Sequence, residues 1–246
     1  MDKAYIFEFI GTLVLVLLGD GVCAATSLNK SKAKGGGWVV IALAWGLAVM
    51  MGALIAGPVS GAHLNPAVTL GLALAGKFAW SSVCGYIVAQ MLGGFVGAVL
   101  VYVFYKDHYA ATADEPDTML GTFCTMPAIW NPWRNFLSEL IATCLLVFVI
   151  LAIGFEGNAF QIGGTAASTG AIGAWPVTCL IMALGMSLGG TTGYAMNPAR
   201  DLSPRCAHAI LPIKGKRDSG WNYSWVPVAG PMVGGCLAAG IFLLVF

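Results

Sequence analysis

Long apolar runs separated by short polar connections dominate the chain. A membrane-spanning helix needs about 20 mostly apolar residues, and six runs approach or exceed that length. We expect spans over Tyr5–Thr26, Trp38–Pro58, Ser82–Tyr105, Phe136–Phe155, Ala171–Leu188 and Tyr223–Phe246. The pattern predicts an all-α membrane protein with six transmembrane helices, in one domain that covers residues 1–246.

Two further segments, Asn65–Ala75 and Asn197–Ile210, are partly apolar but too short to span. Each opens with Asn-Pro, and Asn favours the N-cap position while Pro favours the first helical position. We predict two reentrant half-helices that enter the membrane and turn back. Irregular backbone survives at membrane depth only where protein or a water-filled cavity satisfies its polar groups.

The polar connections are short except one. Lys106–Asn135 is the longest, and we expect a surface loop there, over residues 107–134, rather than a soluble domain. The others are Ser27–Gly36, Glu156–Gly170 and Leu211–Asn222.

The chain repeats itself. Three strings recur in the same order: Glu8–Thr12 resembles Glu139–Thr143, Gly61–Ala67 resembles Gly193–Ala199, and Met91–Gly94 resembles Met232–Gly235. The two repeats cover about residues 1–106 and 135–246, each with three spans and one half-helix. An odd number of spans makes the second half enter from the opposite face. Inverted halves place a site at their interface near the midplane, where broken helices meet.

Composition supports a membrane protein and excludes several functions. The chain is 58% hydrophobic and 9% charged, whereas soluble domains carry about 25% charged residues. The net charge of +1 gives no reason to expect a nucleic-acid partner. The seven cysteines form no CxxC pair, and we find no nucleophile–base pairing, metal cluster or phosphate loop. We therefore expect no enzyme, no cofactor and no metal site.

The paired Asn-Pro-Ala strings carry the clearest chemistry. They are Asn65, Pro66 and Ala67, and Asn197, Pro198 and Ala199. A side-chain amide offers two N–H donors, so both Asn side chains would donate to an oxygen of water or a polyol. The positive ends of the two half-helices would repel cations and protons. One such Asn alone is more simply a helix cap; the inverted pair favours a pore.

Arg200 follows the second of these strings. Arginine deep in a membrane protein is costly and by default functional. Its fork of donors can hold two adjacent hydroxyls of a polyol. The alternative is an interfacial side chain that extends to the headgroups.

The strings Ser60–Thr69 (SGAHLNPAVT) and Gly193–Asp201 (GYAMNPARD) resemble the major intrinsic protein superfamily, which comprises aquaporins and glycerol facilitators. The resemblance covers essentially the whole chain. Asp201 and Arg205 after the second motif, and Pro227 and Val228 before the last span, resemble the glycerol facilitator branch.

This resemblance implies a passive channel for glycerol and water that excludes ions and protons. Dihydroxyacetone, urea and protonated lactic acid are further possible solutes. It also implies a homotetramer in the cell membrane of a prokaryote, with both termini in the cytoplasm. The Lys/Arg distribution disagrees with that orientation, because the positive-inside rule favours the reverse. The basic residues that would face outward are Lys30, Lys32, Lys34, Lys214, Lys216 and Arg217.

The resemblance also assigns residues to the pore. The selectivity filter would comprise Trp45, Gly185, Tyr194 and Arg200. Tyr194 stands where a phenylalanine is expected in bacterial glycerol facilitators, which bears on solute preference. The residues expected to turn main-chain carbonyls toward the pore are Gly61, Ala62, His63, Leu64, Ala195 and Met196. His63 is either a pH gate or a structural side chain.

Three carboxylates lie within the predicted spans. We expect Glu8 and Glu139 to accept hydrogen bonds from backbone N–H groups of the reentrant loops, since an unpaired charge there is expensive. The competing interpretation is a proton relay in an ion-coupled transporter, which inverted repeats also permit. Asp20 has no equivalent in the second half, and we place it near the outer end of the first span. A water-specific aquaporin and a structural junction protein are further alternatives.

Overall fold

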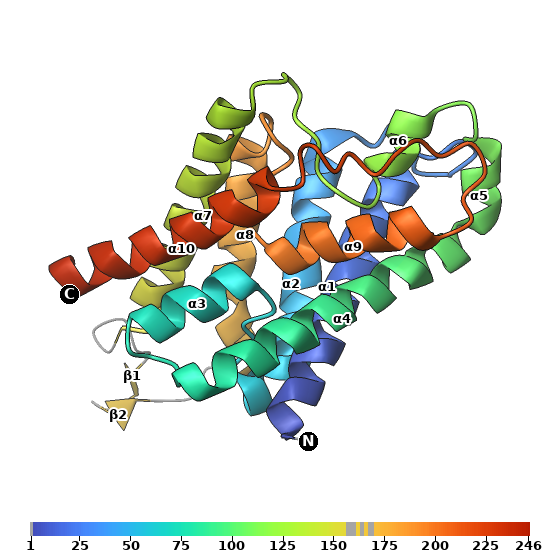
Figure 1. Cartoon of the computed structure of the whole chain (residues 1–246). Coiled ribbons are helices and arrows are strands. Elements are labelled where there is room, and N and C mark those ends of the chain that lie inside the picture. Colours follow the sequence, from blue (N-terminus) through green and yellow to red (C-terminus); the bar gives the residue numbers. More distant parts are fainter. Residues whose placement is uncertain (1, 156–160, 163–164, 167–169) are drawn as a thin grey trace.

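A computed structural model describes residues 2–155, 161–162, 165–166 and 170–246. Long helices surround two shorter ones whose N-terminal ends meet near the middle (Figure 1). Five helices of the described residues are long and apolar enough to cross a membrane. They are α1 (Lys3–Ser27), α2 (Gly37–Ser60), α4 (Trp80–Phe104), α7 (Pro132–Ile153) and α10 (Val226–Val245).

The sixth predicted span is built in two pieces. A 3-10 helix, η2 (Gly170–Ala174), leads into α8 (Trp175–Leu188). The apolar helix over Ile172–Leu188 is shorter than the five others, so our expectation of one regular helix from Ala171 needs correction. Pro176 lies in the first turn of α8, a position that Pro favours because its missing N–H is not needed there.

The two half-helices are α3 (Pro66–Leu74) and α9 (Pro198–Ile210). In Figure 1, α3 lies in the lower half of the molecule and α9 in the upper half. Each is capped as its sequence predicts: Asn65 Oδ1 accepts from the N–H of Ala67 at 2.8 Å, and Asn197 Oδ1 accepts from that of Ala199 at 2.9 Å. The two half-helices thus lie toward opposite ends of the molecule and begin at one level near its middle.

Each half-helix packs on long helices of the other half of the sequence: α9 lies against α4, and α3 against α10. Glycine permits these contacts. A Cβ on Gly94 would lie 2.6 Å from the carbonyl oxygen of Ala199, and one on Gly235 would lie 2.6 Å from that of Ala67. Any side chain there would push the half-helix away, which explains the recurrence of Met-x-Gly-Gly.

The connection between the halves is more than the surface loop we expected. It contains α5 (Lys106–Ala111) and α6 (Pro116–Leu120), and Tyr109, Met119 and Phe123 are fully buried. The Tyr109 hydroxyl lies 2.6 Å from that of Thr122, within hydrogen-bonding distance. The isolated apolar residues of this polar stretch pack down onto the helix ends.

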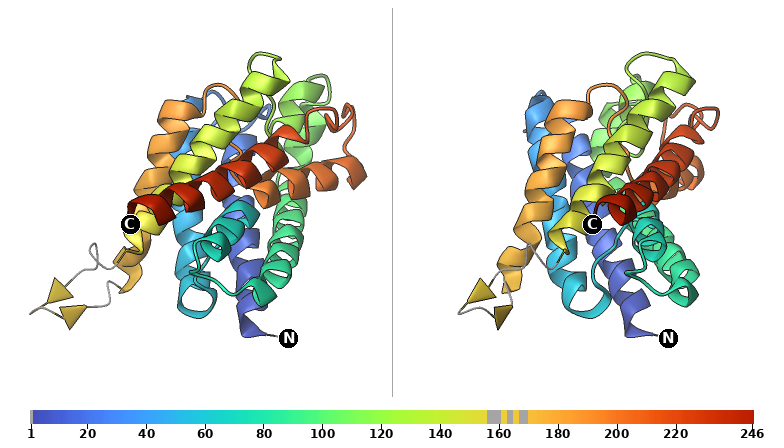
Figure 2. Two further views of the ribbon diagram at one scale, coloured as in Figure 1. Left: turned by 60° about the vertical axis from the view of Figure 1, so that its left-hand side comes forward. Right: turned by 90° about the vertical axis from the view of Figure 1, so that its left-hand side faces the viewer.

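Most of the predicted connection Glu156–Gly170 lies outside the described residues. Within it, β1 (Gln161–Ile162) pairs antiparallel with β2 (Thr165–Ala166). Figure 2 shows this two-stranded element beyond the end of α8.

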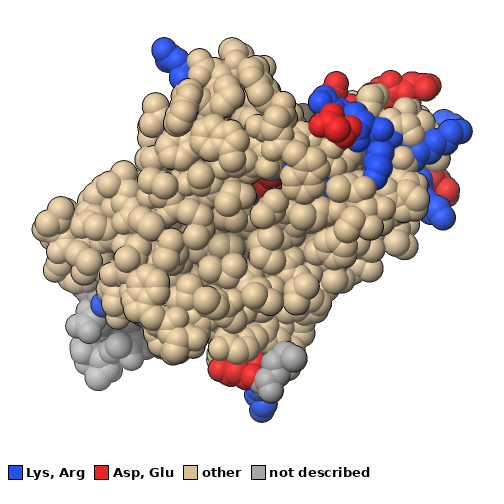
Figure 3. All heavy atoms as spheres, in the orientation of Figure 1, with Lys and Arg blue, Asp and Glu red and all other residues tan. Residues whose placement is uncertain are grey.

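Charged side chains avoid the middle band of the surface seen in Figure 3. In the view of Figure 3 they gather near α5 and α6 at the upper right, with others at the upper left and at the lower edge. The broad band between is almost entirely uncharged, and large apolar side chains such as Val88, Leu92 and Val103 are exposed. A surface of this kind is stable in lipid rather than in water.

Candidate pore

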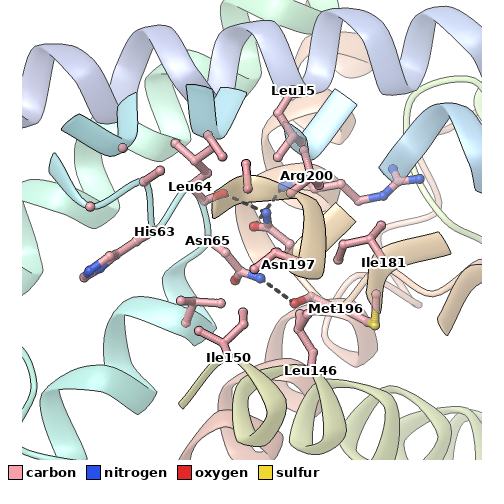
Figure 4. A pocket seen from close by; sticks show the side chains of 18 of the residues that line it. Leu15, His63, Leu64, Asn65, Leu146, Ile150, Ile181, Met196, Asn197 and Arg200 are labelled. Atoms are coloured by element: carbon pink, nitrogen blue, oxygen red, sulfur yellow. Dashed lines mark hydrogen bonds between the residues drawn. The ribbon is translucent and has the colours of Figure 1, made fainter. Parts of the chain in front are cut away.

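A cavity of about 730 Å³ runs between the two half-helices and the surrounding helices. The two reentrant loops line it together with one face each of α2, α7 and α8 (Figure 4). Its apolar wall includes Leu15, Val49, Leu146, Ile150 and Ile181. A narrow polar strip formed by the loops therefore faces a mainly apolar wall.

The two Asn side chains pair across the halves. Asn65 Nδ2 donates to the carbonyl of Met196 at 2.8 Å, and Asn197 Nδ2 donates to that of Leu64 at 2.8 Å (Figure 4). Each Asn oxygen accepts at its own helix cap. Since an amide carries two N–H donors, each Asn has one left for a molecule in the cavity.

The backbone before each Asn follows the same unusual course. Ala62 and Leu64 have φ of 52° and 51°, and Tyr194 and Met196 have φ of 38° and 48°. Left-handed conformations are uncommon for such residues and cost of order 1–3 kcal/mol each where tertiary structure enforces them. Repeating the strain at matching positions indicates that the direction of these peptide groups matters.

All six residues predicted to present carbonyls, Gly61, Ala62, His63, Leu64, Ala195 and Met196, line the cavity.

Buried carboxylates hold the strained loops. Glu8 accepts from the N–H groups of His63 at 2.9 Å and Leu64 at 2.8 Å. Glu139 accepts from those of Ala195 at 2.9 Å and Met196 at 2.8 Å.

Hydroxyls complete both sites: Ser60 donates to Glu8, and Thr192 to Glu139, each at 2.6 Å. Gln90 also donates to Glu8, at 2.7 Å. Both carboxylates are fully buried and neither is among the cavity-lining residues.

Arg200 and Trp45 meet at one end of the cavity, which both line. The Arg200 guanidinium carbon lies 3.9 Å from the centre of the Trp45 ring. Gly19 makes room for that ring, because a Cβ there would lie 2.2 Å from it. In Figure 4 the Arg200 side chain extends toward the side opposite His63.

Tyr194 fills the space beside Gly185. A Cβ on Gly185 would lie 2.8 Å from Tyr194 Cζ and 2.9 Å from its hydroxyl oxygen. Tyr194 lines the cavity, whereas Gly185 is not among the lining residues. The absent side chain of Gly185 therefore accommodates the phenol, rather than leaving open space at the constriction.

The His63 ring points away from the centre of the cavity (Figure 4). Its Nδ1 lies 3.1 Å from Thr69 Oγ1, and the rings of Phe78 and Tyr86 pack against it at centroid distances of 4.5 and 4.9 Å. This arrangement favours the structural interpretation of His63.

Asp201 and Arg205 form a fully buried ion pair at 2.8 Å that ties α9 to two connections. Asp201 accepts from the N–H and hydroxyl of Thr125, both at 2.7 Å. Arg205 donates to the carbonyls of Thr125, Ser219 and Gly220. Both residues anchor the half-helix and lie outside the cavity lining.

The other two branch markers, Pro227 and Val228, lie in the first turn of α10, with Pro227 buried.

Asp20 is the residue whose partner the sequence did not predict. It is buried, with 1% of its surface exposed, and its Oδ1 lies 3.5 Å from Arg200 Nη1. The sequence holds one clue to this contact. A carboxylate within an apolar span needs a cationic partner, and Arg200 is the deepest cation that the motifs indicate.

The model of one family, described as Major intrinsic protein, matches residues 1–242. The chain belongs to the major intrinsic protein family. Within it, the chain is 51% identical over 244 residues to a "Probable glycerol uptake facilitator protein" of Thermotoga maritima, covering 99% of this chain and 100% of that one. It is 52% identical over 235 residues to "Glycerol uptake facilitator protein 3" of Lactiplantibacillus plantarum, covering 96% and 93%.

A solved structure extends the comparison to three dimensions. The aquaglyceroporin from Plasmodium falciparum superposes with a TM-score of 0.84 at 33% identity, covering 99% of this chain and 96% of that chain. The predicted aquaporin-like fold, with six spans and two half-helices in an inverted repeat, is thereby confirmed. As a member of this family the chain is a multi-pass membrane channel and not an enzyme.

Proposed function

We propose that this protein is a passive channel for glycerol and water in the plasma membrane of a prokaryote. The observation that carries the proposal is the reciprocal pairing of Asn65 with Met196 and Asn197 with Leu64. It fixes two amide groups at one level of the cavity, each with an N–H to spare. The two glycerol uptake facilitators that match almost the whole chain at about half identity support glycerol as the solute.

The cavity suits a molecule with hydroxyls on one side and carbon on the other. The loop carbonyls accept hydrogen bonds, and Asn65, Asn197 and Arg200 donate them. Opposite them lie Leu15, Ile150 and other apolar side chains, which a C–H surface can contact without losing hydrogen bonds. Single-file exchange along the polar strip keeps a polyol hydroxyl or a water satisfied throughout.

Selectivity lies in Trp45, Tyr194 and Arg200 at one end of this path. Gly185 acts indirectly, by accommodating Tyr194. Ions gain no substitute for their hydration shell along an apolar wall, and cations and protons also meet the positive ends of α3 and α9. Dihydroxyacetone, urea and protonated lactic acid share the size and neutrality that such a path admits.

The domain organisation follows from the same pairing. We assign residues 1–106 and 135–246 to two inverted repeats within one domain, joined by 107–134. We further propose a homotetramer with cytoplasmic termini. The outward basic residues are partly balanced in this arrangement, since Glu115 lies 3.9 Å from Lys34 and Asp117 pairs with Arg217.

Stopped-flow light scattering on proteoliposomes tests the solute. Vesicles should shrink under an inward glycerol gradient and reswell rapidly, whereas under a sucrose gradient they should shrink and remain shrunken. Protein-free vesicles give the baseline. Rapid shrinkage in both solutes without reswelling in glycerol would assign the chain to water-specific aquaporins instead.

A further inference from the structure

Asp20 and Arg200 are 180 positions apart in the sequence and adjacent in the molecule. Asp20 Oδ1 lies 3.5 Å from Arg200 Nη1, and both side chains are more than nine-tenths buried. Within the part of the chain that the structure describes, neither oxygen of Asp20 has a hydrogen-bond partner. Arg200 is therefore the group that accounts for a carboxylate at this depth.

The two residues have no charged equivalents across the inverted repeat. Glu8 corresponds to Glu139, so Asp20 corresponds to Leu151; Ala67 corresponds to Ala199, so Arg200 corresponds to Val68. Leu151 and Val68 are both buried apolar residues. Asp20 and Arg200 are thus both charged, whereas their equivalents Leu151 and Val68 are both apolar. This change in both positions together indicates that the two charges act as a pair.

Asp20 balances the charge of Arg200 without occupying its hydrogen-bond donors. At 3.5 Å Asp20 is an ion-pair partner of Arg200, near the limit for a hydrogen bond. Asp20 does not line the cavity, whereas Arg200 does. Asp20 thus compensates the charge from behind while the guanidinium, held against Trp45 at 3.9 Å, can direct its N–H groups to a solute.

The pair also changes the field at the constriction. A lone guanidinium in a weakly polar surrounding attracts small anions strongly, because its field is only weakly screened there. An adjacent carboxylate converts that charge into a dipole whose field falls off much faster. The neighbouring Asp201–Arg205 pair is already neutral, so Asp20 determines whether this level of the pore carries net charge.

We propose that Asp20 sets the ion specificity of the filter. It neutralises the charge of Arg200 and thereby prevents the filter from admitting or retaining small anions. The proposal rests on the proposed function, because it assigns Arg200 to the filter of a channel for neutral solutes. It makes exclusion of ions of both signs a property of the pair and not of Arg200 alone.

The test compares chloride and potassium permeabilities of proteoliposomes that contain the wild type, Asp20→Asn, Arg200→Gln or the double variant. Chloride entry is followed by quenching of entrapped lucigenin, and potassium entry by an entrapped potassium-sensitive dye. In Asp20→Asn the uncompensated guanidinium should raise the chloride-to-potassium ratio by about tenfold. In Arg200→Gln the uncompensated carboxylate should lower it, and the double variant should show no preference.

A purely structural role would not produce effects of opposite sign. Asp20→Glu should keep the wild-type ratio, and Asp114→Asn at an exposed position controls for surface charge. A wild-type ratio in Asp20→Asn would overturn the proposal. If Asp20→Asn fails to fold, Arg200→Gln and the double variant decide, and equal ratios in those two would also overturn it. Absence of glycerol flux in the wild type would instead refute the proposed function, whatever the ion ratios.

Discussion

The side-chain amide of Asn65 donates to the main-chain carbonyl of Met196 at 2.8 Å, 131 positions along the chain. The same bond in mirror order joins Asn197 to Leu64. Each Asn therefore caps a helix and bonds the two halves together, and we propose that its second N–H donates to a molecule in the cavity. Substitution can separate the capping role of the oxygen from the two donor roles of the amide nitrogen.

Asn65→Ser keeps an oxygen at the N-cap, where Ser is a favourable residue, and removes both amide donors. One donor lost to the solute is worth about 1 kcal/mol, or roughly a fivefold fall in glycerol flux. Stopped-flow reswelling measures this, and Asn197→Ser should behave alike. Undiminished flux in both variants would show that the amide donors do not act on the solute.

Tyr194→Phe removes a hydroxyl that is buried against Gly185. The hydroxyl has no hydrogen-bond partner among the described residues, so its removal costs the fold no hydrogen bond and leaves room for the ring to move away from the solute path. We expect the ratio of glycerol to water permeability to rise about two- to fivefold, which is the effect of up to ~1 kcal/mol at the constriction.

Tyr223→Phe is the matched control for this change. Tyr223 is fully buried with a hydroxyl that likewise has no partner among the described residues, and it does not line the cavity. The permeability ratio should stay at the wild-type value. A fall in the ratio for Tyr194→Phe would mean that the hydroxyl assists glycerol.

Glu139→Gln tests the support role of the buried carboxylates. An amide cannot accept all the bonds that Ala195, Met196 and Thr192 now donate. A buried polar group left without a partner costs about 1–3 kcal/mol, so the thermal unfolding midpoint in detergent should fall.

Asp114→Asn at an exposed position provides the control, with little expected change. An unchanged midpoint for Glu139→Gln, together with loss of a proton-dependent flux, would support the relay interpretation instead.

Glycerol flux should be constant between pH 5.5 and 8. His63 is held by Thr69 and two aromatic rings, away from the cavity centre, so its titration should not block the path. Two surface carboxylates, Glu115 and Asp218, respond only at lower pH. Hydrogen bonds from Asn29 and Thr118 lower the pKa of Glu115 below 4.5, and the N–H of Gly220 lowers that of Asp218 below 3.8.

Both of these pKa shifts are downward, which fixes how the stability of the fold changes with pH. A carboxylate whose pKa is lower in the folded state stabilises the fold above its unfolded pKa, and the contribution disappears as the pH falls through the folded pKa. Both losses lie below the tested range. A step in flux within this range that disappears in His63→Gln would establish the pH gate.

The sequence predicted the elements that local pattern determines. Hydropathy located the spans, and Asn-Pro located the half-helices with their caps. Burial of the connection was not predictable in this way, because Tyr109 and Phe123 are isolated apolar residues whose contacts come from distant helices.

The proposed filter shows the same division. The motif singles out Arg200 and Tyr194, but the packing of Tyr194 into the space beside Gly185 depends on contacts between distant segments. Asp20 was left without a role since no local pattern specifies a partner 180 positions away. Pairings between distant segments needed the structure.

Passive transport is the central claim, and radiolabelled glycerol uptake tests it most directly. Proteoliposomes receive an imposed proton or sodium gradient, and the internal glycerol concentration is followed to its plateau. The account predicts the same plateau with and without either gradient, equal to the external concentration. A plateau above the external concentration that collapses with an ionophore would contradict a channel and identify an ion-coupled transporter.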